Sequence, residues 1–573
     1  MKNNLRPIQR LFALLKINRD EIYRIYFFAA FIGIVNLTIP LGIQGIVNFI
    51  QIGTVSSSWI ILSLLVILGV TLAGGLQILQ FRLTENIQQN IFVRSSFELA
   101  YRIPRLKFNQ ISKYYGPELL NRFFDTMTIQ KGTAKLLLDF ATSAMQIVLA
   151  LLLLSFYHPF FILFGLILVV VISILFRWTH PRGMETSLNE SKYKYEMANW
   201  LEELARTYAS FKLVGRTELP MKETDRHAMN YLGARQNHFK VLVAQFMSMV
   251  GIKVLVTAAL LLLGGALVME QQMNLGQFVA AEIIIVLILN NVEKLMRSIE
   301  TAYDTLTGLE KIGYVTDLEL EEDNLGLFID FGNKPLAVKF DEVAIAGNEP
   351  GTQILNQLSF EIDPGGLTCI TGTASSGKTT LMKVLSGLIA ADSGRLIFND
   401  KLNVNLNLNQ LRDLIGDYYS EEELFNGTIW ENITMGREGL DDQFILDLSK
   451  KIGLDEFVLK NKNGYNHRIL HRGQNLPEGV RKKILILRSM ARKPLLLLVE
   501  DSFGNLPFKE RDQIYQLYQN IPFPTTLVMV STNPVWLRRA KNILVLDKGQ
   551  LFNQGHFDMI KKDLLDLQII ENA

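Results

Sequence analysis

The stretch Gly372-Thr373-Ala374-Ser375-Ser376-Gly377-Lys378-Thr379 decides the fold of the second half of this chain. Two glycines separated by four residues, then Lys and a hydroxyl residue, form the phosphate-loop pattern. An apolar run at 367–370 precedes the loop, and a helical pattern at 381–385 follows it. This strand–loop–helix order predicts that backbone N–H groups and the helix N-terminus bind phosphate oxygens.

The loop residues have separate expected roles. Lys378 is expected to reach the β and γ phosphates of a nucleotide, and Thr379 to ligate Mg²⁺. The alternative, an ordinary Gly/Ser turn, does not explain the flanking strand and helix. The predicted nucleotide-binding set is Gly372, Thr373, Ala374, Ser375, Ser376, Gly377, Lys378, Thr379 and Thr380.

The composition indicates a chain with two different halves. Of 573 residues, 49% are hydrophobic and 20% charged, which is too apolar for a purely soluble protein and too charged for a purely membranous one. The net charge of +2 gives no case for nucleic-acid binding. The single cysteine, Cys369, excludes an intrachain disulfide framework and a Cys-rich metal site.

The first half contains six apolar stretches, each near or above the ~17 residues that cross a bilayer. They are predicted near 25–50, 59–81, 136–157, 159–177, 241–269 and 276–292. The third and fourth are separated only by His158 and Pro159 and predict a tight hairpin. Before them, residues 5–16 alternate apolar and basic at helical spacing, which fits an interfacial membrane helix or an ordinary amphipathic core helix.

The connecting segments predict the orientation of these spans. Segments 51–58, 157–159 and 270–275 contain no Lys or Arg, whereas the N-terminus and the long connections 82–135 and 177–240 are rich in both. The positive-inside rule therefore predicts a multi-pass protein of the inner membrane with both termini cytoplasmic. The two long connections read mostly as helix and are expected to project into the cytoplasm.

Ionisable residues inside apolar spans often mark a polar path. Lys253, Asp139, Glu282 and Glu293 occupy such positions. Lining a polar cavity and forming structural pairs or snorkelling to the interface remain equal alternatives for them.

The second half reads as an α/β domain. An acidic linker at 317–323 is followed by short β-type runs, the phosphate loop, helices, and a buried strand at 495–499 that precedes Glu500 and Asp501. Alternating strands and helices predict a largely parallel sheet. The predicted domains are an N-terminal helix at 1–22, a transmembrane domain at 23–312, a linker at 313–334 and a cassette at 335–573.

These features together resemble a half-size ABC exporter, a six-span membrane domain fused to an ATP-binding cassette. The resemblance rests on the phosphate loop, on 424–433 (LFNGTIWENI), on 393–396 (SGRL) and 544–549 (LVLDKG), and on 115–122 (YGPELLNR), which is similar to the first coupling segment. It implies a membrane α-helical bundle followed by an α/β P-loop NTPase cassette, the cofactors ATP and Mg²⁺, and a dimer in which both long connections contact cassettes.

Several positions depart from the family's catalytic pattern. The adenine-stacking aromatic is absent near Ala346 and Gly347, and the family's Gln falls on Ser420. The signature becomes Leu476-Pro477-Glu478-Gly479-Val480, where Pro477 lacks a donor and Glu478 brings a negative charge towards phosphate. The strand-end pair is Glu500-Asp501, the switch His falls on Thr532, and the next connecting motif, 504–507, lacks its final Asp.

The sequence therefore predicts ATP binding more strongly than hydrolysis. Glu500 is expected to reach Mg²⁺, and Asp501 is a catalytic candidate one methylene short of the family's Glu, where a ~1 Å misplacement can cost about 10²-fold in rate. One hypothesis is an ATP-binding half-transporter that exports a substrate as a homodimer or heterodimer. The other is a catalytically silent nucleotide-binding subunit that regulates or scaffolds a transporter or secretion complex. Expected partners are a second half-transporter, membrane lipid, an unidentified substrate and, as a further candidate, a periplasmic adaptor.

Overall fold

The computed structural model describes residues 6–52, 57–111, 119, 121–321, 326–347, 349, 351–419 and 421–570. The chain divides into two compact units, Met1–Leu320 and Glu321–Ala573, and this division falls inside the predicted linker 313–334. Ser420, linker residues 322–323 and most of the predicted coupling segment, at 115–118 and 120, lie outside the described residues.

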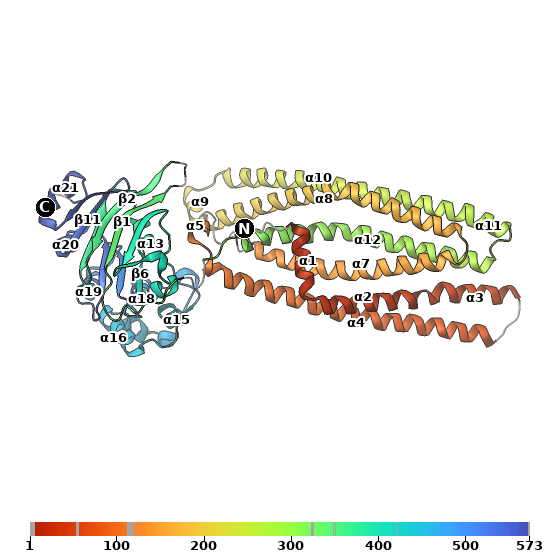
Figure 1. Cartoon of the computed structure of the whole chain (residues 1–573), viewed down its shortest axis with the longest axis horizontal. Helices are drawn as coiled ribbons and strands as arrows, with labels where there is room; N and C mark the ends of the chain where they lie inside the picture. The colour runs from red at the N-terminus through yellow and green to blue at the C-terminus, as the bar shows by residue number, and fades with distance from the viewer. Residues whose placement is uncertain are drawn as a thin grey trace. The chain divides into compact units, whose positions relative to one another are not determined.

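The first unit is helical throughout its described core (Figure 1). Five helical segments are long and apolar enough to cross a membrane, and a shorter apolar segment, Phe160–Ile174, begins a sixth helix. Helices therefore cover all six predicted spans. Their order is α1 (Pro7–Ile17), α2 (Arg19–Asn36), α3 (Thr38–Ile52), α4 (Ser57–Arg102), α5 (Phe108–Ile111), α7 (Asp125–Ser155), α8 (Phe160–Arg206), α9 (Tyr208–Val214), α10 (Leu219–Ala259), α11 (Gly265–Met269) and α12 (Leu275–Thr316).

The first predicted span is two helices rather than one. Helix α2 ends at Asn36 and α3 begins at Thr38, whose hydroxyl donates to the Val35 carbonyl at 2.6 Å. Pro40 lacks a backbone N–H and cannot continue the ladder of α2. The helix before this span, α1, has no buried residue, and its Arg10 forms an ion pair with Asp317.

The long connections are continuous with the spans, as predicted. Helices α4, α8 and α10 contain 46, 47 and 41 residues, so each extends well past its apolar segment. At ~1.5 Å per residue, α8 is about 70 Å long. Figure 1 shows α8 and α10 side by side over most of their length.

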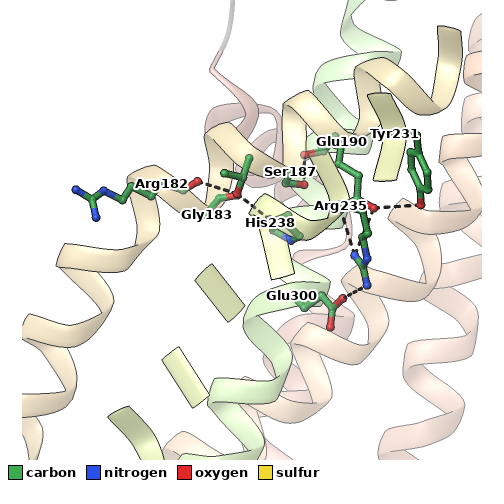
Figure 2. Close-up of polar contacts among 10 residues, drawn as sticks. Arg182, Gly183, Ser187, Glu190, Tyr231, Arg235, His238 and Glu300 are labelled. Carbon is green, nitrogen blue, oxygen red and sulfur yellow. Dashed lines mark hydrogen bonds and ion pairs between the residues drawn. The ribbon is translucent and has the colours of Figure 1, made fainter. Parts of the chain in front are cut away.

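A polar cluster beyond the apolar segments joins α8 and α10 to α12 (Figure 2). Arg235 of α10 donates to Glu190 of α8 and to Glu300 of α12, each at 3.3 Å. Nearby, buried His238 contacts the Thr186 hydroxyl at 2.8 Å. These contacts fix the α8–α10 pair against α12 at the end of the helical bundle away from α11.

The described residues of the second unit form three sheets. A six-stranded sheet has the order β12-β11-β3-β10-β9-β6, in which only β12 is antiparallel to its neighbour. Its strands are β3 (Leu367–Gly372), β6 (Ile415–Tyr418), β9 (Leu496–Glu500), β10 (Thr526–Val530), β11 (Asn542–Asp547) and β12 (Gln550–Gly555). An antiparallel sheet, β2-β1-β4-β5, comprises β1 (Val338–Ala346), β2 (Gln353–Ile362), β4 (Ser393–Phe398) and β5 (Lys401–Leu402), and a small third sheet pairs β7 (Gly427–Thr428) with β8 (Arg468–Ile469).

Helices cover this parallel sheet and complete the cassette. They are α13 (Lys378–Leu385), α14 (Leu408–Asp413), α15 (Ile429–Thr434), α16 (Asp442–Ile452), α17 (Asp455–Lys460), α18 (Glu478–Met490), α19 (Phe508–Gln519), α20 (Pro534–Arg539) and α21 (Phe557–Asp566). Residues of β9 such as Leu497 and Leu498 are completely buried between two apolar clusters, as a central parallel strand requires. The predicted α/β cassette with a largely parallel sheet is confirmed.

Candidate nucleotide-binding site

The phosphate loop connects β3 to α13 and depends on its two glycines. Gly377 has a φ of +95°, and a Cβ there would lie 2.6 Å from the Leu355 side chain. A Cβ on Gly372 would lie 2.0 Å from the Leu546 carbonyl oxygen of β11. Both positions therefore exclude a side chain, and the loop backbone passes close to the neighbouring strand and to β2.

Lys378 is the first residue of α13, and its side chain contacts the residues of the phosphate loop. Its ammonium donates to the carbonyls of Gly372 at 3.1 Å and Thr373 at 2.6 Å, and to the Ser376 hydroxyl at 3.2 Å. Burial lowers the pKa of Lys378. A phosphate group would replace these neutral oxygens with a charged acceptor, which forms stronger hydrogen bonds.

The other residues of the phosphate loop lie in the same strand–helix turn as Lys378. The Thr373 hydroxyl donates to Asp547 at 2.7 Å, and Ser376 is buried. Thr379 and Thr380 lie in the first turn of α13, where unpaired backbone N–H groups favour anions. The predicted set 372–380 is thus placed together at one strand–helix turn.

Glu500 and Asp501 follow one another at the end of β9 but have different surroundings. Glu500 is the last residue of β9, two strands from β3 in the sheet. A Thr hydroxyl and a carboxylate are the hard oxygen donors that Mg²⁺ prefers, so Thr379 and Glu500 are of the right type to hold it.

Asp501 is enclosed by hydrogen bonds within the cassette. One carboxylate oxygen accepts from Ser531 at 2.7 Å and the other from the Tyr515 hydroxyl at 3.4 Å. Asn533 donates to the same tyrosine oxygen at 2.8 Å. Burial is the main cause of a raised pKa at Asp501, and the Ser531 hydrogen bond opposes it. This carboxylate therefore bridges the ends of β9 and β10 to α19.

The altered signature caps α18 in a different way from a Ser-Gly-Gly sequence. Pro477 is the residue before the helix, and Glu478, its first residue, pairs with Lys482 at 2.8 Å. Lys482 also donates to the Ser502 carbonyl at 2.5 Å. A Cβ on Gly479 would lie 1.8 Å from a Glu510 carboxylate oxygen, so a side chain there would require Glu510 to move. The Glu478 carboxylate is thus charged, half-exposed and paired at the helix N-terminus.

Sequence reasoning missed the partners of Asp501. Ser531 adjoins the predicted switch position, Thr532, which is itself exposed. Tyr515 and Asn533 come from α19 and the start of α20, and no motif signals them. No motif signals the contact of Lys482 either, because its acceptor, the Ser502 carbonyl, lies on the segment after β9.

Two family models match this chain in succession. The ABC transporter transmembrane region matches residues 22–292, and the ABC transporter domain matches residues 355–503. The chain belongs to the ABC transporter family and combines the membrane and ATP-binding parts of a half-size exporter. The second match implies that the cassette of this exporter half binds ATP, and the first makes it a multi-pass membrane protein.

Similar proteins agree with this family. A bacterial Atm1-family ABC exporter solved with ATP bound superposes with a TM-score of 0.83 over 98% of this chain and 100% of that chain, at 19% identity. An uncharacterized ABC transporter ATP-binding protein of Bacillus subtilis is 30% identical over 46% of this exporter half and 45% of its own length. A putative export ATP-binding/permease protein of Rickettsia felis is 24% identical over 69% and 68%. The exporter half spans about half the length of the first curated relatives that it matches.

Proposed function

We propose that this exporter half binds ATP at 372–380 and couples binding to substrate export as part of a dimer, with weak or no hydrolysis at its own site. The observation that carries this proposal is the enclosure of Asp501. A catalytic carboxylate must be free to orient the attacking water. Both oxygens of Asp501 already accept protein hydrogen bonds, and its shorter side chain reaches less far than a glutamate.

The loop supports the first part of the proposal. Its glycines, Lys378 and the N-terminus of α13 form a phosphate cradle, and Thr379 with Glu500 would hold Mg²⁺. Mg²⁺ held by these residues would supply positive charge that offsets the negative charge of the phosphates. Lys378 would then exchange its carbonyl contacts for phosphate oxygens.

The altered signature at 476–480 favours a heterodimer over a homodimer. In this family each signature completes the partner's nucleotide site, and Glu478 brings a carboxylate to that position. A homodimer would carry this charge at both sites. A partner with an intact signature would complete the site at 372–380, and Asp501 would remain its weak point.

The test uses the full chain purified in lipid. We expect nucleotide binding in the presence of Mg²⁺ and a turnover rate that does not exceed that of Lys378→Ala. Lys378→Ala should weaken ATP binding about 10–100-fold, because a hydrogen-bonded charge contributes about 1.5–3 kcal/mol. Lys383→Ala, on the same helix, should bind like the parent. Rapid hydrolysis that disappears in Lys378→Ala would contradict the proposal.

Asp501→Asn separates a structural carboxylate from a catalytic one. We expect it to leave the low turnover unchanged, since both carboxylate oxygens already accept hydrogen bonds from Ser531 and Tyr515. Co-expression with candidate partners then distinguishes the two roles: nucleotide-dependent export supports an exporter half, whereas a complex that exports equally well with Lys378→Ala supports a silent scaffold.

A further inference from the structure

Glu282 is an exposed carboxylate within the apolar part of α12. Among the described residues it has no hydrogen bond or ion pair. The other three ionisable candidates of the spans are paired: Asp139 accepts from Ser298 at 2.7 Å and lies 3.0 Å from Lys294, and Lys253 donates to Glu293 at 3.3 Å. Glu282 is therefore the unpaired charge to explain.

Glu282 belongs to a continuous face of α12. At about 100° per residue, Glu282, Val286, Asn290, Glu293 and Arg297 lie within roughly 80° around the helix axis. Val286 is 49% exposed and Arg297 is 66% exposed. The opposite face, including Ile284, Ile288 and Val292, is buried in the core of the bundle. We call the exposed set the polar face of α12.

Lipid is a poor neighbour for this face. A carboxylate at the centre of a membrane helix costs about 2.5–3.5 kcal/mol even on insertion scales. A purely apolar exposed surface exists elsewhere: Leu64, Leu65 and Leu68 of α4 are all more than half exposed. The contrast indicates that α4 faces lipid there and that the polar face of α12 meets water.

The inner end of the polar face opens into a cavity. A hollow of about 570 Å³ between α10 and α12 is lined by Arg235, Phe239, Phe246, Arg297 and Glu300, among others. Figure 2 shows two of these lining residues, Arg235 and Glu300, pointing toward one another. Glu282 lies eleven residues from Glu293, about 16 Å further along the helix. The face thus runs from a cavity that includes Arg235, Arg297 and Glu300 to the single negative charge of Glu282.

We propose that the polar face of α12 lines the substrate path and that Glu282 makes its outer part selective for cationic groups, an ammonium or guanidinium on the substrate. The inner groups already neutralise one another, so they contribute polarity rather than selectivity. This inference rests on the proposed export function.

The test measures access and charge preference without the substrate. Val286→Cys places a thiol one turn from Glu282, and native Cys369 is buried and gives a low background. In proteoliposomes, its reaction rates with methanethiosulfonates bearing trimethylammonium or sulfonate are compared. We expect both to react, the cationic reagent faster. Adding Glu282→Gln should lower the ratio of rates about tenfold, since a unit charge at ~6 Å in water changes each rate about threefold in opposite directions.

Leu68→Cys on α4 is the matched control for a thiol facing lipid. If Val286→Cys reacts no faster than Leu68→Cys, the polar face does not meet water and the proposal fails. If Val286→Cys reacts but Glu282→Gln leaves the ratio unchanged, Glu282 does not set selectivity and that part is overturned. ATP binding is measured on the same samples, so a failure of the proposed nucleotide function is seen separately.

Discussion

Glu422 shows how burial in the cassette changes the behaviour of a single residue. It lies in a cavity of about 380 Å³ together with Asp417, Arg488 and Arg492. One carboxylate oxygen accepts from the Tyr419 backbone N–H at 3.3 Å, and the other lies 3.8 Å from Arg488. Burial and then the Asp417 charge raise the pKa of Glu422 to about 8. The two carboxyl groups therefore hold a proton near neutral pH.

Glu422→Gln should make the stability of the cassette less dependent on pH. The folded state holds the proton more tightly than the unfolded state, whose Glu pKa is about 4.3, so stability falls as pH rises from there to about 8. Glutamine imitates the protonated carboxyl and removes this loss. We expect a higher Tm than the parent at pH 8 and a smaller difference at pH 5, measured by thermal unfolding; each kcal/mol corresponds to about 2–4 °C.

Glu421→Gln is the control, because Glu421 is exposed beside it. Equal effects of the two substitutions at pH 8 would show that Glu422 does not carry the proton.

Sequence patterns predict the residues of the phosphate loop well, because two glycines, Lys and Thr are needed locally. They do not predict the hydrogen bonds that the Asp501 carboxylate accepts, since Ser531 and Tyr515 come from separate elements. Likewise, nothing near Glu422 in the sequence shows that Arg488, more than sixty residues later, lies beside it.

Helices α8 and α12 approach closely where glycine permits it. A Cβ on Gly183 would lie 2.3 Å from Cζ of Tyr303, a buried residue whose hydroxyl accepts from Gln245 of α10 at 3.1 Å. Gly183 lies on the same helix as Ser187 and Glu190 (Figure 2). The small residue therefore sets the spacing at which the polar cluster forms.

Gly183→Ala should destabilise the membrane unit by about 1–3 kcal/mol, the usual cost of overpacking. Thermal unfolding in detergent measures this as a lower Tm. Gly233→Ala on α10 is the matched variant, because no atom lies within 4 Å of its added Cβ. It should stabilise by up to about 1 kcal/mol through helix propensity. A Gly183→Ala protein as stable as Gly233→Ala would refute the close approach.

At the scale of elements, hydropathy located all six apolar spans and the hairpin between α7 and α8. It merged α2 with α3, because apolar content continues unbroken through the junction at Leu37. Hydropathy also could not predict the pairing of Lys253 with Glu293, since the packing of the helices decides which charges meet.

The charge asymmetry of the connections remains the basis for the orientation of the whole molecule. Both termini are predicted in the cytoplasm. Met269, at the end of α11, is 87% exposed, and Met559, on α21 of the cassette, is 81% exposed. These two methionines provide a matched pair on opposite sides of the predicted membrane.

On intact cells, a membrane-impermeant maleimide should label Met269→Cys and spare Met559→Cys. After permeabilisation both should react, which shows that each thiol is accessible. Labelling of Met559→Cys on intact cells would reverse the predicted orientation.

The enclosure of Asp501 also provides a built-in optical reporter. Tyr515, which donates to Asp501, packs edge-on against the buried Trp536 with ring centroids 5.0 Å apart. Any movement that frees the carboxylate must shift the tyrosine and change the surroundings of that indole. Because the chain has five tryptophans, the other four must be replaced before emission from Trp536 reports the state of Asp501 without an attached dye.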